Sequence, residues 1–413
     1  LEQVLRLVSN LILTRLLFPE AFGIMALAST ILVGLSMLSD IGIEQSVIQN
    51  KKGSETHFRN TAWVAQIFRG FVLWLFASLI AYPTAIFYDS SVLFPLICAL
   101  GSTLAIKGFS STSIAVGNKE LKIFKLSAVN LGTQSLSIVL TVAFAFYTNS
   151  VWALVWGNII SSFIGVFAGH IFLNDGFKHR IKVDWTSMHQ IISFGKWIFI
   201  SSILGFIANQ ADRIIIGKVL SLADLGVFTI AMTLAQVPRA ILFSLNRMVL
   251  FPVYSKIQNQ NETEITNKVF RSKLFINGML LPIALALLIL GKPLIEYLYD
   301  ERYSDAGWML QILAIGIAFE IATNVGPYYL GLGKANLFAL MVGVKAILLV
   351  SSMLVGVSLF GDKGLIFGIV SSSVLYYLVE IYFLNKYKIW FWKVDIFFIS
   401  LIIFFAYLSY TWH

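Results

Sequence analysis

The sequence has little of what soluble enzymes use to build a reactive site. It contains one cysteine, Cys98, and five histidines in 413 residues. A single cysteine excludes a disulfide within the chain and a metal site built from cysteines. No two histidines have the spacing of a helical zinc pair, and no phosphate-binding loop or serine-nucleophile motif occurs. The sequence therefore predicts no metal, no cofactor and no enzymatic activity.

Charged residues are also scarce. They make up 12% of the chain, whereas 58% of the residues are hydrophobic, and an average soluble domain has about 25% charged residues. Apolar runs of about 20 residues, the length that crosses a bilayer, recur along the whole chain. They predict an all-α polytopic membrane protein with about thirteen spans. The predicted spans lie near residues 1–18, 22–39, 61–87, 92–114, 124–147, 151–173, 190–217, 225–250, 268–290, 307–330, 335–359, 364–384 and 394–411.

The basic residues between these spans are unevenly distributed. Most of them fall in alternate connections, and only Lys218, Lys292, Arg302 and Lys363 fall in the others. Because Lys and Arg are retained on the cytoplasmic side, this bias predicts a cytoplasmic N-terminus. The net charge of +9 is then a topology signal that also suits anionic membrane lipids, so we expect no nucleic-acid partner. The chain begins without Met inside an apolar run, and we expect the natural N-terminus to lie upstream.

Self-similarity at an offset of about 200 residues indicates two halves. ILTRLLFPEAFGI (12–24) matches IIGKVLSLADLGV (215–227) in its basic, Leu and Gly positions, and WALVWG (152–157) resembles KGLIFG (363–368). Such repeats are common in transporters. The pattern predicts two six-helix bundles related by pseudo-twofold symmetry, with a cleft between them. The expected boundaries are 1–173 for the first bundle, 174–189 for a cytoplasmic linker, 190–384 for the second bundle and 385–413 for an extra helix.

Three segments carry a resemblance to a known family. They are R-L-L-x-P-E-x-F-G from Arg15, DIGIEQSVIQNK from Asp40 and N-x-x-D-x-x-I-I-G-x-x-L from Asn209. In this order they resemble the polysaccharide-export flippases of the multidrug/oligosaccharidyl-lipid/polysaccharide (MOP) superfamily, closest to the O-antigen and colanic-acid exporters. The resemblance implies alternating-access transport of undecaprenyl-diphosphate-linked oligosaccharide units across a bacterial inner membrane. It also implies contact with membrane lipids and other polysaccharide assembly proteins.

Several basic residues lie inside or at the edges of the predicted spans. A charge at the centre of a membrane helix costs about 2.5–3.5 kcal/mol on insertion scales, so these side chains should face a wet cavity or a partner. The clear intramembrane acids, Asp212, Glu320 and Glu380, are fewer, so we expect surplus positive charge that an anionic cargo complements. The basic residues are Arg6, Arg15, Arg69, Lys107, Lys196, Arg213, Arg239 and Lys345.

Helical spacing places many polar residues on shared faces. Such stripes, which include Glu320 with Thr323, Asn324 and Pro327, fit a hydrated lumen that could hold sugar hydroxyls. Within it, Arg69 and Arg213, one from each half, are the expected ligands of the diphosphate. The predicted substrate-binding residues are Arg6, Asn10, Gln66, Arg69, Asn209, Asp212, Arg213 and Lys345.

Other roles for these residues stay open. Asp212 and Arg213 can equally form bridges between helices, and Lys107 fits an anchor at the membrane interface. Arg239 lies near the end of its span, where a long side chain can snorkel. Glu320 is either a counter-ion for a basic residue or a protonation site that couples transport to a gradient.

Alternative functions also stay open. A multidrug or cation antiporter of the same superfamily would need net acidic lumen residues, and a peptidoglycan-precursor flippase would differ mainly in its substrate. A membrane glycosyltransferase or polymerase would need a sizeable loop with paired acids or histidines. The short stretch KPLIEYLYDERYSDAGW (292–308) is the only acidic candidate for such a loop.

Overall fold

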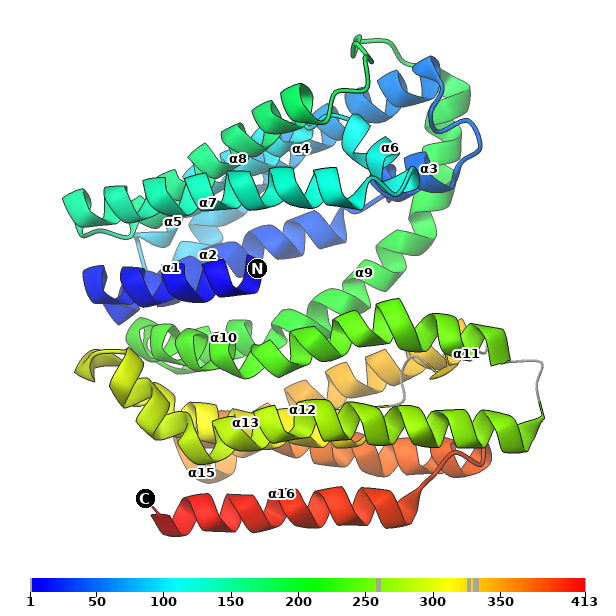
Figure 1. Cartoon of the computed structure of the whole chain (residues 1–413). Coiled ribbons are helices and arrows are strands. Elements are labelled where there is room, and N and C mark those ends of the chain that lie inside the picture. Colours follow the sequence, from blue (N-terminus) through cyan, green and yellow to red (C-terminus); the bar gives the residue numbers. More distant parts are fainter. Residues whose placement is uncertain (1, 258–260, 325–327, 330–333, 413) are drawn as a thin grey trace. The chain divides into compact units, whose positions relative to one another are not determined.

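The computed structural model describes the chain except residues 1, 258–260, 325–327, 330–333 and 413. Every regular element in this part of the chain is a helix (Figure 1). Nine of the described helices are long and apolar enough to cross a membrane, or ten if the bent pair α5 (Leu93–Gly108) and α6 (Ser113–Lys119) forms one span. The predicted class, an all-α polytopic membrane protein, is confirmed.

Leu1–Phe206 form one compact unit, here called the N-terminal bundle. In it α4 packs against α5, α7 against α8, α2 against α5, and α1 against α7. Pro19 opens α2, where its missing N–H removes no helical hydrogen bond. Its remaining elements are α1 (Glu2–Leu16), α2 (Pro19–Leu38), α3 (Ile43–Gln49), α4 (Thr56–Phe87), α7 (Ile123–Thr148), α8 (Trp152–Phe172) and the first part of α9 (Trp185–Val219).

Ile207–His413 form the second unit, here called the C-terminal bundle. In it α12 packs against α13, and α13 also contacts α10, α15 and α16. Its elements after α9 are α10 (Leu222–Leu245), the π-helix η1 (Asn246–Leu250), α11 (Phe251–Ile257), α12 (Glu262–Leu298), the 3-10 helix η2 (Glu301–Tyr303), α13 (Ala306–Ala322), α15 (Ala335–Lys386) and α16 (Trp392–Trp412).

The division between the units falls inside α9, not in the polar linker before it. The first part of α9 packs closely against α2. An added Cβ on Gly34 of α2 would meet the Phe206 ring at 2.8 Å, and one on Gly205 of α9 would meet Met37 at 3.4 Å. The N-terminal bundle therefore extends beyond the expected boundary at residue 173 and includes the linker itself.

Each predicted span falls on a helix, but four of them differ from expectation. The predicted span 92–114 ends at Gly108, and α6 follows at an angle of 64°. The predicted span 307–330 ends as α13 at Ala322, and Pro327 lies outside the described residues. The predicted spans 335–359 and 364–384 are both within α15 and meet at Gly361, whose φ of +60° is open to glycine without strain.

The linker after α8 is bound along the end of the N-terminal bundle. Arg59, whose side chain is 5% exposed, pairs with Asp175 at 2.7 Å and stacks on Phe177 with its guanidinium 3.8 Å from the ring centroid. The backbone N–H groups of Arg180 and Asp184 donate to Asn60 and Thr61 of α4 at 2.9 and 2.8 Å. The segment 175–184, called the strap below, is therefore fixed to α4.

Electrostatics of the strap follow from these contacts. Burial alone raises the pKa of Asp175, but hydrogen bonds from Arg59 and Ser113 and the charge of Arg59 outweigh it and bring the pKa to about 2. Burial and the charges of His170 and Arg59 lower the pKa of His179 to about 4. His179 is therefore neutral near pH 7, and its Nε2 accepts from the Thr112 backbone N–H at 3.2 Å.

The last helix, α16, is an integral part of the C-terminal bundle. Asp395, 1% exposed, forms an ion pair with Lys273 of α12 and accepts a 2.7 Å hydrogen bond from the Tyr377 hydroxyl of α15. At the other end, Gln311 donates to the Ser409 hydroxyl, which in turn donates to a carbonyl of α12. These polar contacts stabilise α16 inside a largely apolar environment.

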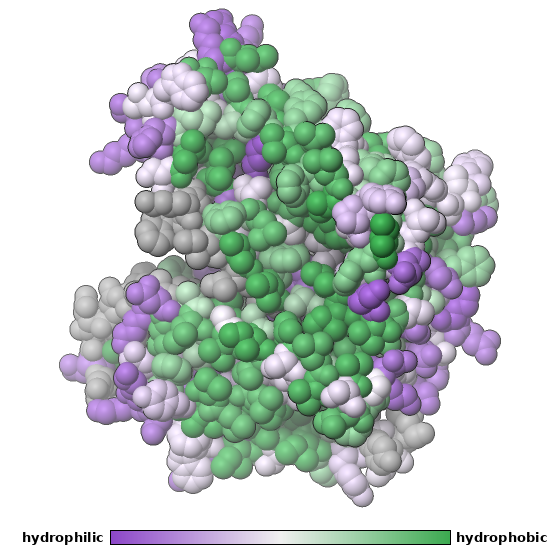
Figure 2. Space-filling model, turned by 180° about the vertical axis from the view of Figure 1, so that it is seen from behind, coloured by the Kyte–Doolittle hydropathy of each residue, from purple (hydrophilic) through white to green (hydrophobic). Residues whose placement is uncertain are grey.

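The surface is apolar to a degree that only a membrane tolerates. Large hydrophobic side chains such as Phe68, Phe124 and Phe167 are 68% or more exposed. Figure 2 shows hydrophobic residues over much of one face, with hydrophilic residues gathered toward its edges. Because soluble monomers rarely expose apolar patches of this extent, the chain is a membrane protein.

Candidate functional site

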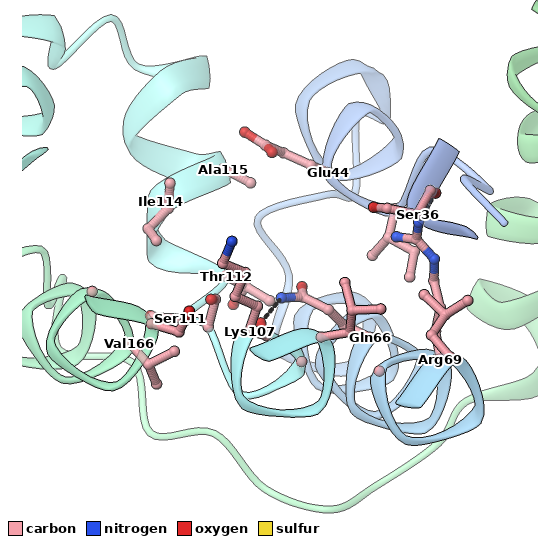
Figure 3. A pocket seen from close by; sticks show the side chains of 18 of the residues that line it. Ser36, Glu44, Gln66, Arg69, Lys107, Ser111, Thr112, Ile114, Ala115 and Val166 are labelled. Carbon is pink, nitrogen blue, oxygen red and sulfur yellow. Dashed lines mark hydrogen bonds between the residues drawn. The ribbon is translucent and has the colours of Figure 1, made fainter. Parts of the chain in front are cut away.

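The N-terminal bundle contains a polar cavity of about 550 Å³ (Figure 3). Helices α2 to α8 all contribute to its wall. Its polar lining includes four charged groups, several hydroxyls and several amides. The polar lining residues are Ser36, Asp40, Glu44, Gln45, Gln66, Arg69, Lys107, Ser110, Ser111, Thr112, Asn130, Asn158, Ser161 and Ser162.

Two glycines bring the basic side chains of this wall together. An added Cβ on Gly70 of α4 would meet the Leu104 carbonyl of α5 at 2.6 Å, and one on Gly108 would meet the Gln66 carbonyl at 3.0 Å. Small residues of this kind let membrane helices approach closely. The Gln66 amide consequently donates to the Lys107 carbonyl at 3.2 Å.

Arg69 points toward the end of α2. Its Nη2 donates to the Ser36 carbonyl at 2.6 Å and to the Ser39 hydroxyl at 3.1 Å, and its Nε donates to the same hydroxyl at 3.2 Å. Its Nη1 lies 4.0 Å from the Asp40 carboxylate. A guanidinium against the last carbonyls of a helix is favoured by the helix dipole, so Arg69 caps α2.

The two acids of the cavity also have partners. Asp40 accepts from the Gly42 backbone N–H at 2.9 Å, and Gly42 has a φ of +60° that suits glycine. Glu44, at the start of α3, accepts from the Asn118 amide of α6 at 2.9 Å. Both acids follow α2 in a segment that the sequence suggested was a cytoplasmic connection.

Lys107 is the basic residue whose place differs most from the sequence interpretation. It was compatible with an anchor at the membrane interface, but it lies in the cavity wall, next in the chain to the run Ser110–Thr112. Figure 3 shows its side chain on the far side of Gln66 from Arg69. The hydroxyl run that follows Lys107 is the signal in the sequence that could have placed it there.

In the C-terminal bundle, Glu320 of α13 joins two basic residues. Its carboxylate lies 2.9 Å from Lys345 Nζ of α15 and 3.3 Å from Arg239 Nε of α10. Asp212 of α9 lines the same small space and is 6% exposed. Asp212 accepts from the Arg213 backbone N–H at 2.8 Å, a contact between neighbours. Arg239 is thus engaged with an acid, and the structure gives no need for it to snorkel.

A second cavity of about 610 Å³ lies beside this cluster. Phe243, Phe251 and Phe338 give it largely apolar walls. Asn246 of η1 and Asn324 exchange hydrogen bonds of 3.2 and 2.8 Å in the same wall. Its charged lining residues are Arg247, Glu320, Lys345 and Glu380.

The expected surplus of positive charge is wrong for these two cavities. The lining of the N-terminal cavity has two acids and two basic residues, and so does the lining of the C-terminal cavity. The acids that balance the first cavity are Asp40, between α2 and α3, and Glu44, at the start of α3, where no span was predicted. Sequence periodicity could not reveal that this connection folds back to a cavity wall.

The remaining predicted residues lie apart from the described cavities. Arg6 is exposed on α1. Asn10, one turn further along, has a buried amide oxygen that accepts no hydrogen bond from the described residues. Arg213 is half-buried on α9, and the side chain of Asn209 lies outside the described residues. The structure therefore groups Gln66 with Arg69, and Asp212 with Glu320 and Lys345, but does not join Arg6 or Asn10 to either set.

These features define the class of the protein: a polytopic membrane protein of two helix bundles, each with a cavity that carries paired and unpaired charges. The chain belongs to the polysaccharide biosynthesis protein family, whose model matches residues 12–308. The sequence motifs led us to expect a polysaccharide family, and this membership confirms it.

Curated relatives agree with this membership. The chain is 21% identical to the lipopolysaccharide biosynthesis protein WzxC of Escherichia coli over 91% of this chain and 77% of that protein. It is 24% identical to an uncharacterized membrane protein in the cps region of Klebsiella pneumoniae, over 93% and 79% of the two chains. It is 25% identical to the succinoglycan biosynthesis transport protein ExoT of Rhizobium meliloti, over 80% and 66%.

Solved structures show the same fold. The lipid II flippase MurJ in an inward closed conformation aligns with a TM-score of 0.77 at 12% identity, over 99% of this chain and 90% of that one. An inward-facing multidrug transporter of the MATE family aligns with a TM-score of 0.71 at 13% identity, over 94% and 95%. At these identities the likeness supports the fold alone.

Proposed function

We propose that the protein is a flippase that moves lipid-linked oligosaccharide units, carried on undecaprenyl diphosphate, across a bacterial inner membrane by alternating access. It supplies surface polysaccharide assembly and works as a transporter, not as an enzyme. The observation that carries the proposal is a polar cavity of about 550 Å³ inside an apolar bundle of a chain that belongs to the polysaccharide biosynthesis protein family.

The chemistry of the cavity suits this cargo. Hydroxyl and amide groups such as those of Ser111, Asn130 and Asn158 exchange hydrogen bonds with sugar hydroxyls. Basic side chains in a low-dielectric wall form charge-assisted hydrogen bonds with phosphate oxygens. The apolar outer surface leaves the polyprenyl chain in lipid. In this proposal the N-terminal cavity receives the headgroup.

One experiment fills the cavity without disturbing its walls. Gly165 of α8 lines the cavity, and a Cβ added there meets nothing within 4 Å. We expect Gly165→Phe to abolish surface polysaccharide in a bacterium that depends on this chain, and to leave lipid-linked oligosaccharide on the cytoplasmic leaflet. The matched control is Gly132→Phe on α7, which also meets open space but does not line the cavity. Normal polysaccharide with Gly165→Phe at equal protein level would refute the proposal.

The topology is part of the proposal. We infer that the strap and the ends of α2, α4, α6 and α8 near it face the cytoplasm, with the N-terminus on the same side. The uneven distribution of Lys and Arg supports this orientation. Reporter fusions after residue 182 are expected to behave as cytoplasmic and fusions after residue 304 as external, and the opposite pattern would overturn it.

A further inference from the structure

The N-terminal cavity holds two basic side chains in different situations, and the difference assigns their roles. Resting on the proposed function, we propose that Lys107 is the side chain of this bundle that binds the phosphate of the lipid-linked cargo, and that Arg69 instead holds α2 against α4.

Arg69 has little left to offer a ligand. Its Nε and Nη2 are used by the Ser39 hydroxyl and the Ser36 carbonyl, at 2.6–3.2 Å, and its Nη1 faces Asp40. An incoming phosphate would have to break contacts that cap the end of α2. The loss of these existing contacts would reduce the net free energy of phosphate binding.

Lys107 has its backbone fixed and its charge available. Its carbonyl accepts from the Gln66 amide at 3.2 Å and from the Ser110 N–H at 3.0 Å. Among the described residues no acid lies within ion-pair distance of its ammonium group, which lines the cavity. A lysine ammonium is a compact point charge with three donors, a common ligand of phosphate.

The acids of the cavity do not cancel this charge. Asp40 is engaged by the Gly42 N–H and faces Arg69, and Glu44 accepts from Asn118. The Ser110–Thr112 run next to Lys107 adds hydroxyls to the same wall. Lys107 is therefore the cation of this cavity that gains most from an anion, because an unpaired charge inside a membrane bundle is costly.

The chemistry that fits is an anionic phosphate group, whether a diphosphate, a phosphodiester or the free ion. Three sources carry it: the cargo lipid, an anionic phospholipid and free inorganic phosphate. Binding of undecaprenyl diphosphate, phosphatidylglycerol and inorganic phosphate to the purified full chain in detergent separates them. We expect undecaprenyl diphosphate to bind most tightly and Lys107→Gln to weaken it about tenfold, as the loss of one charge-assisted contact predicts. Lys107→Arg keeps the charge and is expected to stay within about threefold of wild type.

The matched variant concerns Arg69. Ser39→Ala removes the hydroxyl that accepts hydrogen bonds from Nε and Nη2 of Arg69. This substitution is milder than a change at Arg69 itself. We expect Ser39→Ala to lower the thermal midpoint without changing undecaprenyl diphosphate affinity, and Lys107→Gln to do the reverse. The opposite pattern, or equal binding by wild type and Lys107→Gln, overturns the proposal. Preferential loss of phosphatidylglycerol or free phosphate in Lys107→Gln, with undecaprenyl diphosphate binding unchanged, also overturns it.

Failure of the proposed function gives a different result. If wild-type protein in vesicles moves no lipid-linked oligosaccharide while Lys107 still determines undecaprenyl diphosphate binding, the flippase function is wrong and the phosphate site stands. If transport occurs and its half-saturating substrate concentration is the same in Lys107→Gln and wild type, the flippase function stands and the phosphate site is wrong.

Discussion

The two bundles treat their charges differently. In the N-terminal cavity, Arg69 is bound to the end of α2 and Lys107 has no acidic partner among the described residues. In the C-terminal bundle, a single carboxylate on α13, Glu320, lies within 3.3 Å of both Arg239 and Lys345. The cavity beside it has mostly apolar walls. One bundle leaves Lys107 available to a ligand, and the other holds Arg239 and Lys345 against one shared acid.

The difference shows that each bundle arranges its charges in its own way. Membrane bundles are held by close packing and by polar contacts between helices, and each half satisfies these needs with different residues. Both bundles use glycines for close approach, Gly70 with Gly108 in the first and Gly356 with Gly364 in the second. The C-terminal bundle adds ion pairs between its long helices, and the Lys273–Asp395 pair between α12 and α16 is the most buried of them. Ligand chemistry is therefore expected to concentrate in the first bundle and charge-dependent stability in the second.

The largest effect is expected at Asp395. Asp395→Asn keeps an acceptor for Tyr377 but leaves the Lys273 ammonium, 5% exposed, without its counter-ion. Removing one partner of a buried ion pair costs about 3–5 kcal/mol. We expect a drop in thermal midpoint and in the yield of folded protein, measured by fluorescence-detected size exclusion during heating.

Two further variants decide whether pairing is the cause. Lys273→Met with Asp395→Leu removes both charges and is expected to recover most of the lost stability. Lys122→Ala at the exposed pair with Glu120 is expected to change nothing. If Asp395→Asn melts like wild type, charge pairing does not stabilise the C-terminal bundle and the comparison fails.

Glu320 should give the next largest effect. Glu320→Gln leaves Arg239 and Lys345 without an acid in contact, at a cost of about 2.5–3.5 kcal/mol by membrane insertion scales. The double variant Glu320→Gln with Lys345→Met removes one excess charge and is expected to regain part of the thermal midpoint. Transport by the double variant identifies Glu320 as a structural counter-ion. A folded double variant that binds substrate but no longer responds to a proton gradient would instead make Glu320 the coupling group.

The third largest effect is expected where α4 and α5 approach each other closely. Gly108→Val adds atoms where the Gln66 carbonyl and the Ile67 Cα lie 3.0 and 3.2 Å from a Cβ, and overpacking of this kind costs about 1–3 kcal/mol. We expect lower stability and weaker substrate binding together, because the wall that carries Gln66 and Lys107 shifts. Gly132→Val, at a position open for 4 Å, is the control. Equal thermal midpoints of the two variants would show that α4 and α5 accommodate the added atoms without strain.

Much of the fold followed from hydrophobic length alone, because a membrane helix must be apolar over about 20 residues. The predicted limits of α7, 124–147, differ by one residue at each end from Ile123–Thr148. The bend after Gly108 was missed, although four hydroxyl residues, 110–113, separate the apolar part of α5 from Ile114 and the backbone turns there. The sequence of a helix shows which of its residues share a face. It does not show which other helix packs against that face.

The candidate site was predicted less well for the same reason. Gln66 and Arg69 were both predicted to bind substrate; they are three residues apart, which places them on one helix face, and both line the cavity. Lys107 and Glu44 reach that cavity from other elements, and only tertiary packing brings them there. Whether these residues bind substrate remains the prediction tested by the variants above.

The smallest effect concerns the strap of the N-terminal bundle. The pKa of His179 is about 4 when the strap is bound, whereas a released, solvated histidine has a pKa of about 6.5. Between pH 4 and pH 6.5 the released strap therefore binds a proton at His179 that the bound strap does not. The bound state is fully favoured above about pH 6.5 and loses stability as the pH falls toward 4. The amides of Arg180 and Asp184, held by α4, report this opening by hydrogen–deuterium exchange corrected for intrinsic rates. We expect faster exchange at pH 5 than at pH 7 in wild type and no such difference in His179→Gln. A pH difference that persists in His179→Gln would assign the sensitivity to another group, because Asp175, with its pKa of about 2, keeps its charge throughout this range.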